Sequence, residues 1–265
     1  MMKQQHLTAE QFGGTAGAYL TSTVHAQGAH LKRLTRLAAS LGTPRALDLG
    51  CGAGHASFAL ARGGAQVTAA DISPEMLAVV AAEAGRRGLA ALRIHHGPAE
   101  ALPFASASFD LVVTRLSAHH WSDVRGALRD VHRVLKPGRT LIVIDVVAAE
   151  VPLLDTFLQA VEVLRDPAHV RDYRVSEWCA MLLASRFYAL TTDAWTLAID
   201  FATWVARHAH LGIADRGHTR RAGPRARRSH RAFQCPGRWF IQARHRMVER
   251  TTTAIEPAIS NQDSA

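Results

Sequence analysis

The sequence lacks several features that would assign it to a special class of protein. It contains no run of 18 or more apolar residues, so we expect no membrane-spanning helix. The N-terminal MMKQQHLTAEQ has no apolar core of the kind that a signal peptide carries. Only three cysteines occur, at positions 51, 179 and 235, without the spacing of a disulfide framework. We therefore expect a cytoplasmic protein with reduced thiols.

Well-known catalytic motifs are absent as well. There is no G-x-x-x-x-G-K-[ST] phosphate loop, no H-E-x-x-H metal motif and no G-x-S-x-G nucleophile elbow. The sequence therefore predicts no resident metal ion. A dinucleotide fingerprint, G-x-G-x-x-G, is also missing, because His55 stands where its third glycine would be.

The net charge of +9 is distributed unevenly. Residues 207–265 hold twelve arginines against four acidic residues, whereas the rest of the chain holds 19 basic and 18 acidic residues. Nucleic-acid contact, which basic clusters favour, would therefore be made only through the C-terminal tail. The remaining length and an apolar content of 48% suit one α/β domain.

The chain is organised around ALDLGCGAGH, residues 46–55. A short apolar run, predicted as a strand, leads into Gly50, Gly52 and Gly54 and then into a helix-forming segment. Glycines allow a ligand to approach bare backbone, and the first N–H groups of a helix lack intrahelical partners. Asp71 follows a second apolar run, where a carboxylate accepts hydrogen bonds from both ribose hydroxyls. These features predict a site for a nucleoside-bearing cofactor.

The rest of this region alternates between strand-like and helical patterns. Strands are expected at 45–49, 66–70, 92–96, 110–116 and 140–147, and helices at 55–62, 74–87 and 124–135. Such alternation predicts a doubly wound, mostly parallel α/β sheet with right-handed crossovers. Ligands bind beyond the carboxyl ends of parallel strands, so we expect the loops after four of these strands to meet there. A further apolar helix is expected around 154–164.

Five motifs occur in a fixed order: LDLGCGAG, ADIS, GPAEALPF, SFDLV and LKPG. In these motifs, residues 1 to about 207 resemble the class I S-adenosylmethionine (SAM)-dependent methyltransferases. They are similar to the type 11 branch, typified by ubiquinone/menaquinone biosynthesis C-methyltransferases. The resemblance implies a Rossmann-like fold, SAM as cofactor and methyl transfer as the reaction. It says little about the methyl acceptor.

The resemblance also implies a set of cofactor-binding residues. They are Asp48, Gly50, Gly52, Gly54, Asp71, Ile72, Met76, Pro98, Ala99 and Glu100. Pro98 departs from the family pattern, because it stands where an acid usually contacts the adenine amine. Backbone groups and packing would have to replace that contact.

Catalytic candidates follow the fourth strand. His119 and His120 have side chains that titrate near neutral pH and could serve as a general base, and Asp145 could do so or orient a histidine. Alternatively, either histidine satisfies a loop carbonyl or caps the next helix. Trp121 is expected in the pocket wall.

The resemblance divides the chain into an N-terminal lid and helix (1–45), a SAM-binding domain (46–207) and a basic tail (208–265). Tyr19, Ser22 and His25 would face the site if the N-terminal segment is a lid, and a simple N-terminal arm remains the alternative. Beyond residue 207 no structural period persists. Whether the sheet has the family's last strand stays open, as does whether the tail is disordered or the product of a shifted reading frame.

Three functions are consistent with these patterns. The first is methyl transfer to a small molecule, such as a quinol, a phenol or another metabolite. The second is methylation of a nucleic acid recruited by the Arg-rich tail, although no NPPY- or DPPY-type run follows the fourth strand. The third is SAM binding without catalysis. The sequence does not indicate the oligomeric state.

Overall fold

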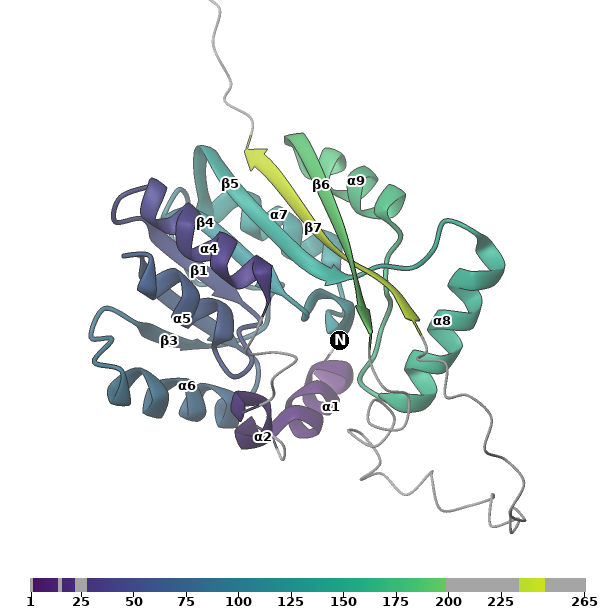
Figure 1. The fold of residues 1–265 in the computed structure, drawn as a ribbon, viewed down its shortest axis with the longest axis horizontal. Coiled ribbons are helices and arrows are strands. Elements are labelled where there is room, and N and C mark those ends of the chain that lie inside the picture. Colours follow the sequence, from purple (N-terminus) through teal and green to yellow (C-terminus); the bar gives the residue numbers. More distant parts are fainter. Residues whose placement is uncertain (1, 14–15, 22–27, 199–233, 246–265) are drawn as a thin grey trace, which may run out of the picture.

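The fold is built on one seven-stranded sheet, in the order β3-β2-β1-β4-β5-β7-β6 (Figure 1). The computed structural model describes residues 2–13, 16–21, 28–198 and 234–245. Five parallel strands are β1 (Arg45–Leu49), β2 (Gln66–Asp71), β3 (Arg93–His96), β4 (Phe109–Arg115) and β5 (Leu135–Val146). The last two, β6 (Phe187–Ala198) and β7 (Gln234–His245), pair antiparallel to each other. This is the predicted doubly wound, mostly parallel α/β architecture.

Helices cover both faces of the sheet. On one face, α4 (Ala29–Ser40) and α5 (His55–Arg62) enclose an apolar core, and α6 (Pro74–Arg86) packs beside α5. On the other face, α7 (Val124–Val134) and α9 (Val175–Ala184) enclose the larger core. Residues 111–113 of β4 are fully buried, because a central parallel strand is covered on both sides.

Most predicted elements of this region are confirmed within a residue or two. The main difference is β5, which begins at Leu135 instead of residue 140. Leu135 pairs with Phe109, and the register then shifts so that Leu111 pairs with Thr140. The LKPG segment is therefore part of β5, although such a sequence is typical of a turn. An irregularity in the pairing with β4 accommodates it.

The last strand, which the sequence left open, is present. β7 pairs antiparallel with β5 from Thr140 to Val146 and covers that edge of the strand. The sequence did not reveal it because QCPGRWFIQARH contains Pro236 and Gly237 and shows no sustained alternation of apolar and polar residues. Of the region after residue 207 the structure describes only this strand, so the boundary at 207/208 and the origin of the tail remain predictions.

Four further helical elements complete the described chain. They are α1 (Met2–Gly13), α2 (Ala16–Thr21), the short 3₁₀ helix η1 (Ala118–His120) and α8 (Pro152–Arg165). The sequence did not predict α1 and α2, since residues 1–28 lack a sustained period. Within the described ranges, no helix has both the length and the apolarity needed to cross a membrane.

Helix α7 begins with a side-chain cap that can be tested. The Asp123 carboxylate accepts a hydrogen bond from the Gly126 N–H at 2.8 Å. Asp123→Ala should lower the free energy of unfolding by about 1 kcal/mol, because a first-turn donor loses its partner. Urea denaturation checks this value. Asp123→Asn keeps a capping oxygen and is the matched control, expected to stay within about 0.5 kcal/mol of the unchanged protein. Equal losses in both variants would contradict the cap.

Candidate active site

A cavity opens at the carboxyl edge of the parallel strands. Its walls come from the loops after β1, β2, β3 and β4, and from α1 and α2. Eight of the ten predicted cofactor residues line it: Gly50, Gly52, Asp71, Ile72, Met76, Pro98, Ala99 and Glu100. The topology thus brings together residues spread over 51 positions of the sequence.

The glycine loop after β1 is held close to its neighbours. Gly50, Gly52 and Gly54 all adopt the left-handed conformation, with φ of 69°, 50° and 85°. A Cβ at Gly50 would collide with the Ser117 hydroxyl, whereas one at Gly52 would meet no atom within 4 Å. The backbone at Gly52 therefore borders open space, as a ligand cradle requires.

The N–H groups of this loop are mostly used within the protein. Those of Gly50 and Cys51 donate to the Ala70 carbonyl, and that of Gly54 donates to Cys51. The Gly52 N–H donates to an Asp71 carboxylate oxygen at 2.8 Å. These bonds fix the loop against β2. The loop thus offers a ligand a rigid bare surface more than a set of free donors.

Asp71 joins two sides of the cavity. Its second oxygen accepts the Ser73 N–H at 2.9 Å, at the start of α6. Burial raises the pKa of Asp71, and the N–H donors of Ser73 and Gly52 partly offset this effect. Each carboxylate oxygen has a second lone pair, so the carboxylate can still accept hydroxyl hydrogen bonds at the cavity wall.

Asp48 and Gly54, the other two predicted cofactor residues, do not line the cavity. Asp48 is fully buried on β1, and one of its oxygens accepts a 2.6 Å hydrogen bond from the Ser57 hydroxyl of α5. Burial raises the pKa of Asp48 to about 6. A Cβ at Gly54 would lie 2.9 Å from the Phe58 ring and 3.0 Å from Val80. Both residues therefore hold the glycine loop in place from the core side, without lining the cavity.

The β2–β3 side of the cavity is mainly apolar. Met76 and Ala99 are buried there, and Pro98 and Ile72 complete this wall. Glu100 differs, because one of its oxygens accepts hydrogen bonds from the Ser122 N–H and hydroxyl and from the Asp123 N–H. Its carboxylate therefore fixes the loop that enters α7.

The N-terminal helices form another wall. Phe12 and Tyr19 line the cavity and contact each other edge to face, with ring centroids 5.8 Å apart. The Tyr19 carbonyl contacts His55 Nε2 at 3.0 Å, which ties α2 to the start of α5. Tyr19 therefore faces the cavity as expected, whereas Ser22 and His25 lie outside the described residues.

Two glutamines of α1 fasten it across the cavity. The Gln4 amide donates to the Ala168 carbonyl at 2.7 Å, and the Gln5 amide donates to Glu100 at 3.4 Å. Sequence reasoning missed these residues because their partners lie 164 and 95 positions away. No local pattern marks such contacts.

His119 does not line the cavity within the described part of the chain. Its Nδ1 lies 2.6 Å from an Asp145 oxygen, and its backbone N–H donates to the other oxygen at 3.3 Å. Burial alone would lower the pKa of His119, but the Asp145 carboxylate raises it to about 9. Conversely, burial would raise the pKa of Asp145, and His119 holds it below its ordinary range. The two residues form a buried ion pair.

His120 does line the cavity. Its Nδ1 lies 3.0 Å from the Ala168 carbonyl, and its ring contacts Phe12 with centroids 4.8 Å apart. A carbonyl can only accept, so Nδ1 carries the proton and Nε2 keeps a lone pair. Burial lowers the pKa of His120, and the positive charge of His119 lowers it further. His120 is therefore neutral. The two adjacent histidines thus differ in both position and charge.

A buried polar segment after α8 lies beside His120. The Asp166 carboxylate accepts the Ala168 N–H at 2.9 Å and lies 4.0 Å from His120 Nε2. Burial raises the pKa of Asp172 to about 8 and lowers that of His169 to about 4. Sequence reasoning missed this segment. The only sequence feature that could have indicated it is the high density of ionisable residues at 165–172, and such density is also typical of an exposed loop.

Known proteins are similar in sequence to parts of this chain. Residues 47–143 match the methyltransferase domain family. The chain is 37% identical over 196 residues to the uncharacterized methyltransferase YcgJ of Bacillus subtilis, covering 74% of this chain and 78% of YcgJ. It is 46% identical over 156 residues to the uncharacterized protein YafE of Escherichia coli, covering 58% of this chain and 74% of YafE.

Two further comparisons concern chemistry and fold. The ubiquinone/menaquinone biosynthesis C-methyltransferase UbiE of Sinorhizobium fredii is 33% identical over 168 residues, covering 60% of this chain and 65% of UbiE. The crystal structure of B. subtilis YcgJ superimposes with a TM-score of 0.69 at 33% identity, covering 81% of this chain and 99% of YcgJ.

The His119–Asp145 pair predicts a titration that NMR can follow. In the unchanged protein, the His119 ring should titrate with a pKa of about 9. Since this pKa is raised, the pair stabilises the fold fully below about pH 6.5, and the contribution is lost as pH rises through about 9. In Asp145→Asn, burial still lowers the pKa of His119 and its largest raising influence is lost, although Asp172 and Glu162 still raise it, so the pKa should fall well below 9. A His119 ring that titrates near 6.5 in both proteins would contradict the ion pair.

Proposed function

The chain belongs to the SAM-dependent methyltransferases, and on that basis we propose that it transfers the SAM methyl group to a small quinol- or phenol-like acceptor. One observation carries the proposal. The glycine loop and the Asp71 carboxylate are joined by a 2.8 Å hydrogen bond at the wall of one cavity. That arrangement offers bare backbone and a hydroxyl-binding acid to one ligand.

The residues of the cavity fit SAM. Asp71 would accept the ribose hydroxyls, and the open side of Gly52 would receive the methionine part. Ile72, Met76 and Ala99 provide apolar surface for an adenine ring. Asp48 and Gly54 would act indirectly, by holding the loop in place.

When bound, SAM supplies a methyl group on a positively charged sulfur, which an acceptor displaces in line. The protein's contribution is to hold the acceptor aligned and to exclude water. Phe12 and Tyr19 of the N-terminal helices and Trp121 beyond η1 supply a largely aromatic wall. The Trp121 indole donates to the Ser117 hydroxyl at 3.0 Å, beside Gly50, which fixes this wall next to the glycine loop.

Among the three predicted catalytic residues, His120 is the best candidate for contact with the acceptor. It is neutral, and its Nε2 lone pair can accept a hydrogen bond from an acceptor hydroxyl and so orient the acceptor; with a pKa lowered to about 3 it is a weak base. His119 and Asp145 then have a positioning role, because their ion pair holds η1 in place. The name of the UbiE relative, a quinone-pathway C-methyltransferase, supports an acceptor of this type.

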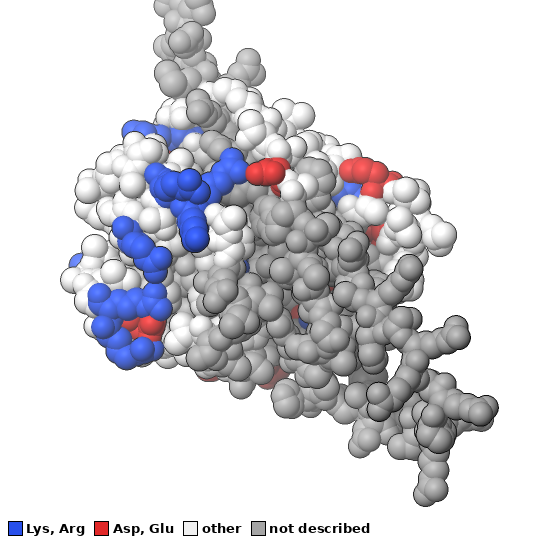
Figure 2. Space-filling model, in the orientation of Figure 1, with Lys and Arg blue, Asp and Glu red and all other residues white. Residues whose placement is uncertain are grey.

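Neither nucleic-acid methylation through the Arg-rich tail nor SAM binding without catalysis receives support from the described residues, which include only Gln234–His245 of the tail. Outside the tail, Figure 2 shows Lys and Arg along the side formed by α4, α5 and α6. However, Arg87 on this side binds Glu83, and Arg33 binds Asp193. A solvated and partly paired face is sufficient to account for it.

Replacement of Asp71 tests the cofactor site. Asp71→Ala should weaken SAM binding by roughly 1–3 kcal/mol, about 5- to 150-fold, through the loss of charge-assisted hydrogen bonds. Isothermal titration calorimetry with SAM measures the change. Asp193→Ala, which removes an exposed carboxylate of β6, is the control and should bind SAM unchanged. Equal affinities for all three proteins would place the ribose elsewhere.

Acceptor chemistry is tested with labelled SAM and a panel of quinols, phenols and amines. We expect transfer to a quinol or phenol, and a loss of about 100-fold in kcat for His120→Ala, because the acceptor loses the group that orients its hydroxyl. SAM affinity should change little. The exposed His6→Ala is the control. Transfer to amines alone, or full activity of His120→Ala, would refute this part of the proposal.

A further inference from the structure

The loop after β3 and helix α1 place two polar side chains next to each other in the cavity wall. Glu100 belongs to the loop and Gln5 to α1, and both residues are half-buried and line the cavity. The Gln5 amide nitrogen donates to one oxygen of Glu100 at 3.4 Å. This polar pair, Gln5 and Glu100, therefore presents a donor and an acceptor side by side.

The orientation of the Glu100 carboxylate is set by its other oxygen. That oxygen accepts the Ser122 N–H at 2.9 Å, the Ser122 hydroxyl at 2.8 Å and the Asp123 N–H at 3.2 Å. Three donors thus hold one end of the carboxylate against the start of α7. The oxygen that Gln5 contacts is left beside α1, and it keeps a second lone pair for a ligand.

The adjoining wall has the properties of a binding surface for a flat base. Ile72 and Met76 come from the segment after β2, and Pro98 and Ala99 from the loop after β3. None of these four side chains can make a strong hydrogen bond, and Pro98 also lacks an N–H. A planar ring that contacts this wall would therefore meet hydrogen-bonding side chains at its edge, where the polar pair lies.

Adenine has an edge that is complementary to the polar pair. Its exocyclic amine donates hydrogen bonds, and the adjacent ring nitrogen N1 accepts one. The second lone pair of the Glu100 oxygen suits the amine, and the second hydrogen of the Gln5 amide suits N1. Hypoxanthine has a carbonyl in place of the amine and a proton on N1. It would set acceptor against acceptor and donor against donor.

On the basis of the SAM site described above, we propose that Glu100 and Gln5 select adenine as the base of the cofactor. Glu100 accepts from the amine, and Gln5 donates to N1. Hydrogen bonds to a charged group are stronger than those between neutral groups, so the Glu100 contact is the larger contribution. Helix α1 thereby takes part in cofactor recognition, although Gln5 lies 95 positions from Glu100 in the sequence.

Calorimetric titration with S-adenosylhomocysteine and with its deaminated analogue, S-inosylhomocysteine, tests the proposal. The unchanged protein should bind the adenine ligand on the order of 100-fold more tightly, because both polar contacts are mismatched in the analogue. Gln5→Ala should reduce this ratio by about three- to tenfold, since the N1 contact is lost. Gln4→Ala is the matched control. It removes the bond from α1 to Ala168 but leaves the polar pair in place, so the ratio should not change.

Glu100→Gln reverses the polarity at one atom. The donors of Ser122 and Asp123 keep the new amide oxygen on their side, so the amide nitrogen takes the position beside Gln5. That nitrogen opposes the adenine amine and suits the hypoxanthine carbonyl. The ratio of affinities should therefore fall by at least about tenfold. Circular dichroism confirms folding of each variant.

Asp71→Ala distinguishes base selection from the cofactor site itself. It should weaken the binding of both ligands by the same factor, because the ribose is common to them. An unchanged protein that binds neither ligand would refute the SAM site and base selection together. Equal affinity of the unchanged protein for the two ligands would overturn base selection alone. A ratio that stays the same in the folded Glu100→Gln and Gln5→Ala variants would also overturn it.

Discussion

The site depends on one partly buried carboxylate that accepts backbone hydrogen bonds from two different loops. Asp71 accepts the Gly52 N–H with one oxygen and the Ser73 N–H with the other. A buried carboxylate is costly unless donors satisfy it, so the glycine loop and the start of α6 are held to it and thereby to each other. This bridge sets the width of the cavity between β1 and β2. The ribose-binding role proposed for Asp71 uses the same group, so structure and recognition are coupled at one residue.

The sequence predicted those parts of the structure that local chemistry determines. The left-handed conformations at Gly50 and Gly54 and the helix start at Pro74 follow from backbone preferences, and the helix predicted from residue 74 is confirmed. Long-range contacts were not predictable. The attachment of Gln4 to Ala168 and the edge pairing of β7 depend on partners far along the chain. The same limit applied to His119 and His120, whose adjacency gives no sign of which one reaches the cavity.

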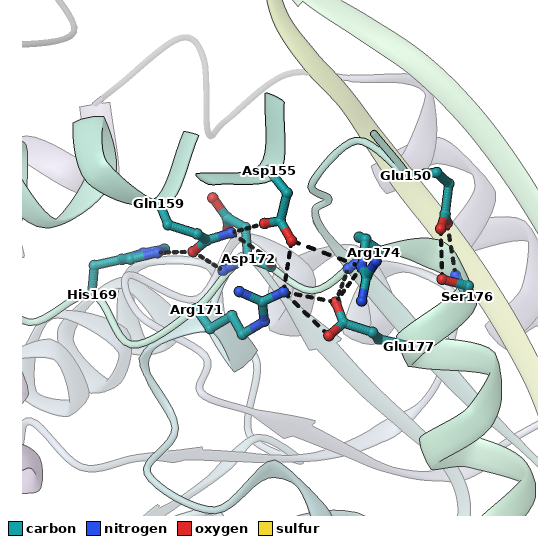
Figure 3. Close-up of polar contacts among 9 residues, drawn as sticks. All are labelled: Glu150, Asp155, Gln159, His169, Arg171, Asp172, Arg174, Ser176 and Glu177. Atoms are coloured by element: carbon teal, nitrogen blue, oxygen red, sulfur yellow. Dashed lines mark hydrogen bonds and ion pairs between the residues drawn. The ribbon is translucent and has the colours of Figure 1, made fainter. Parts of the chain in front are cut away.

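Helix α8 shows why an amphipathic pattern predicts a helix better than it predicts the helix's orientation. Five apolar residues recur at helical spacing in the predicted segment 154–164: Leu154, Phe157, Leu158, Val161 and Leu164. Only Leu158 among them is buried. The side of α8 that faces the protein interior is determined instead by Asp155, Gln159 and Glu162. Their partners lie on the segment before α9 (Figure 3) or within α8 itself. Specific polar contacts here outweigh the general preference for apolar burial. Such a reversal becomes visible only when those partners are known.

The Ala168 carbonyl accepts hydrogen bonds from both Gln4 of α1 and His120. The first turn of α1 is thereby linked to the proposed catalytic histidine through one shared carbonyl. A displacement of α1 that breaks the Gln4 hydrogen bond would therefore also change the surroundings of the His120 ring, although the two side chains are joined only through that carbonyl.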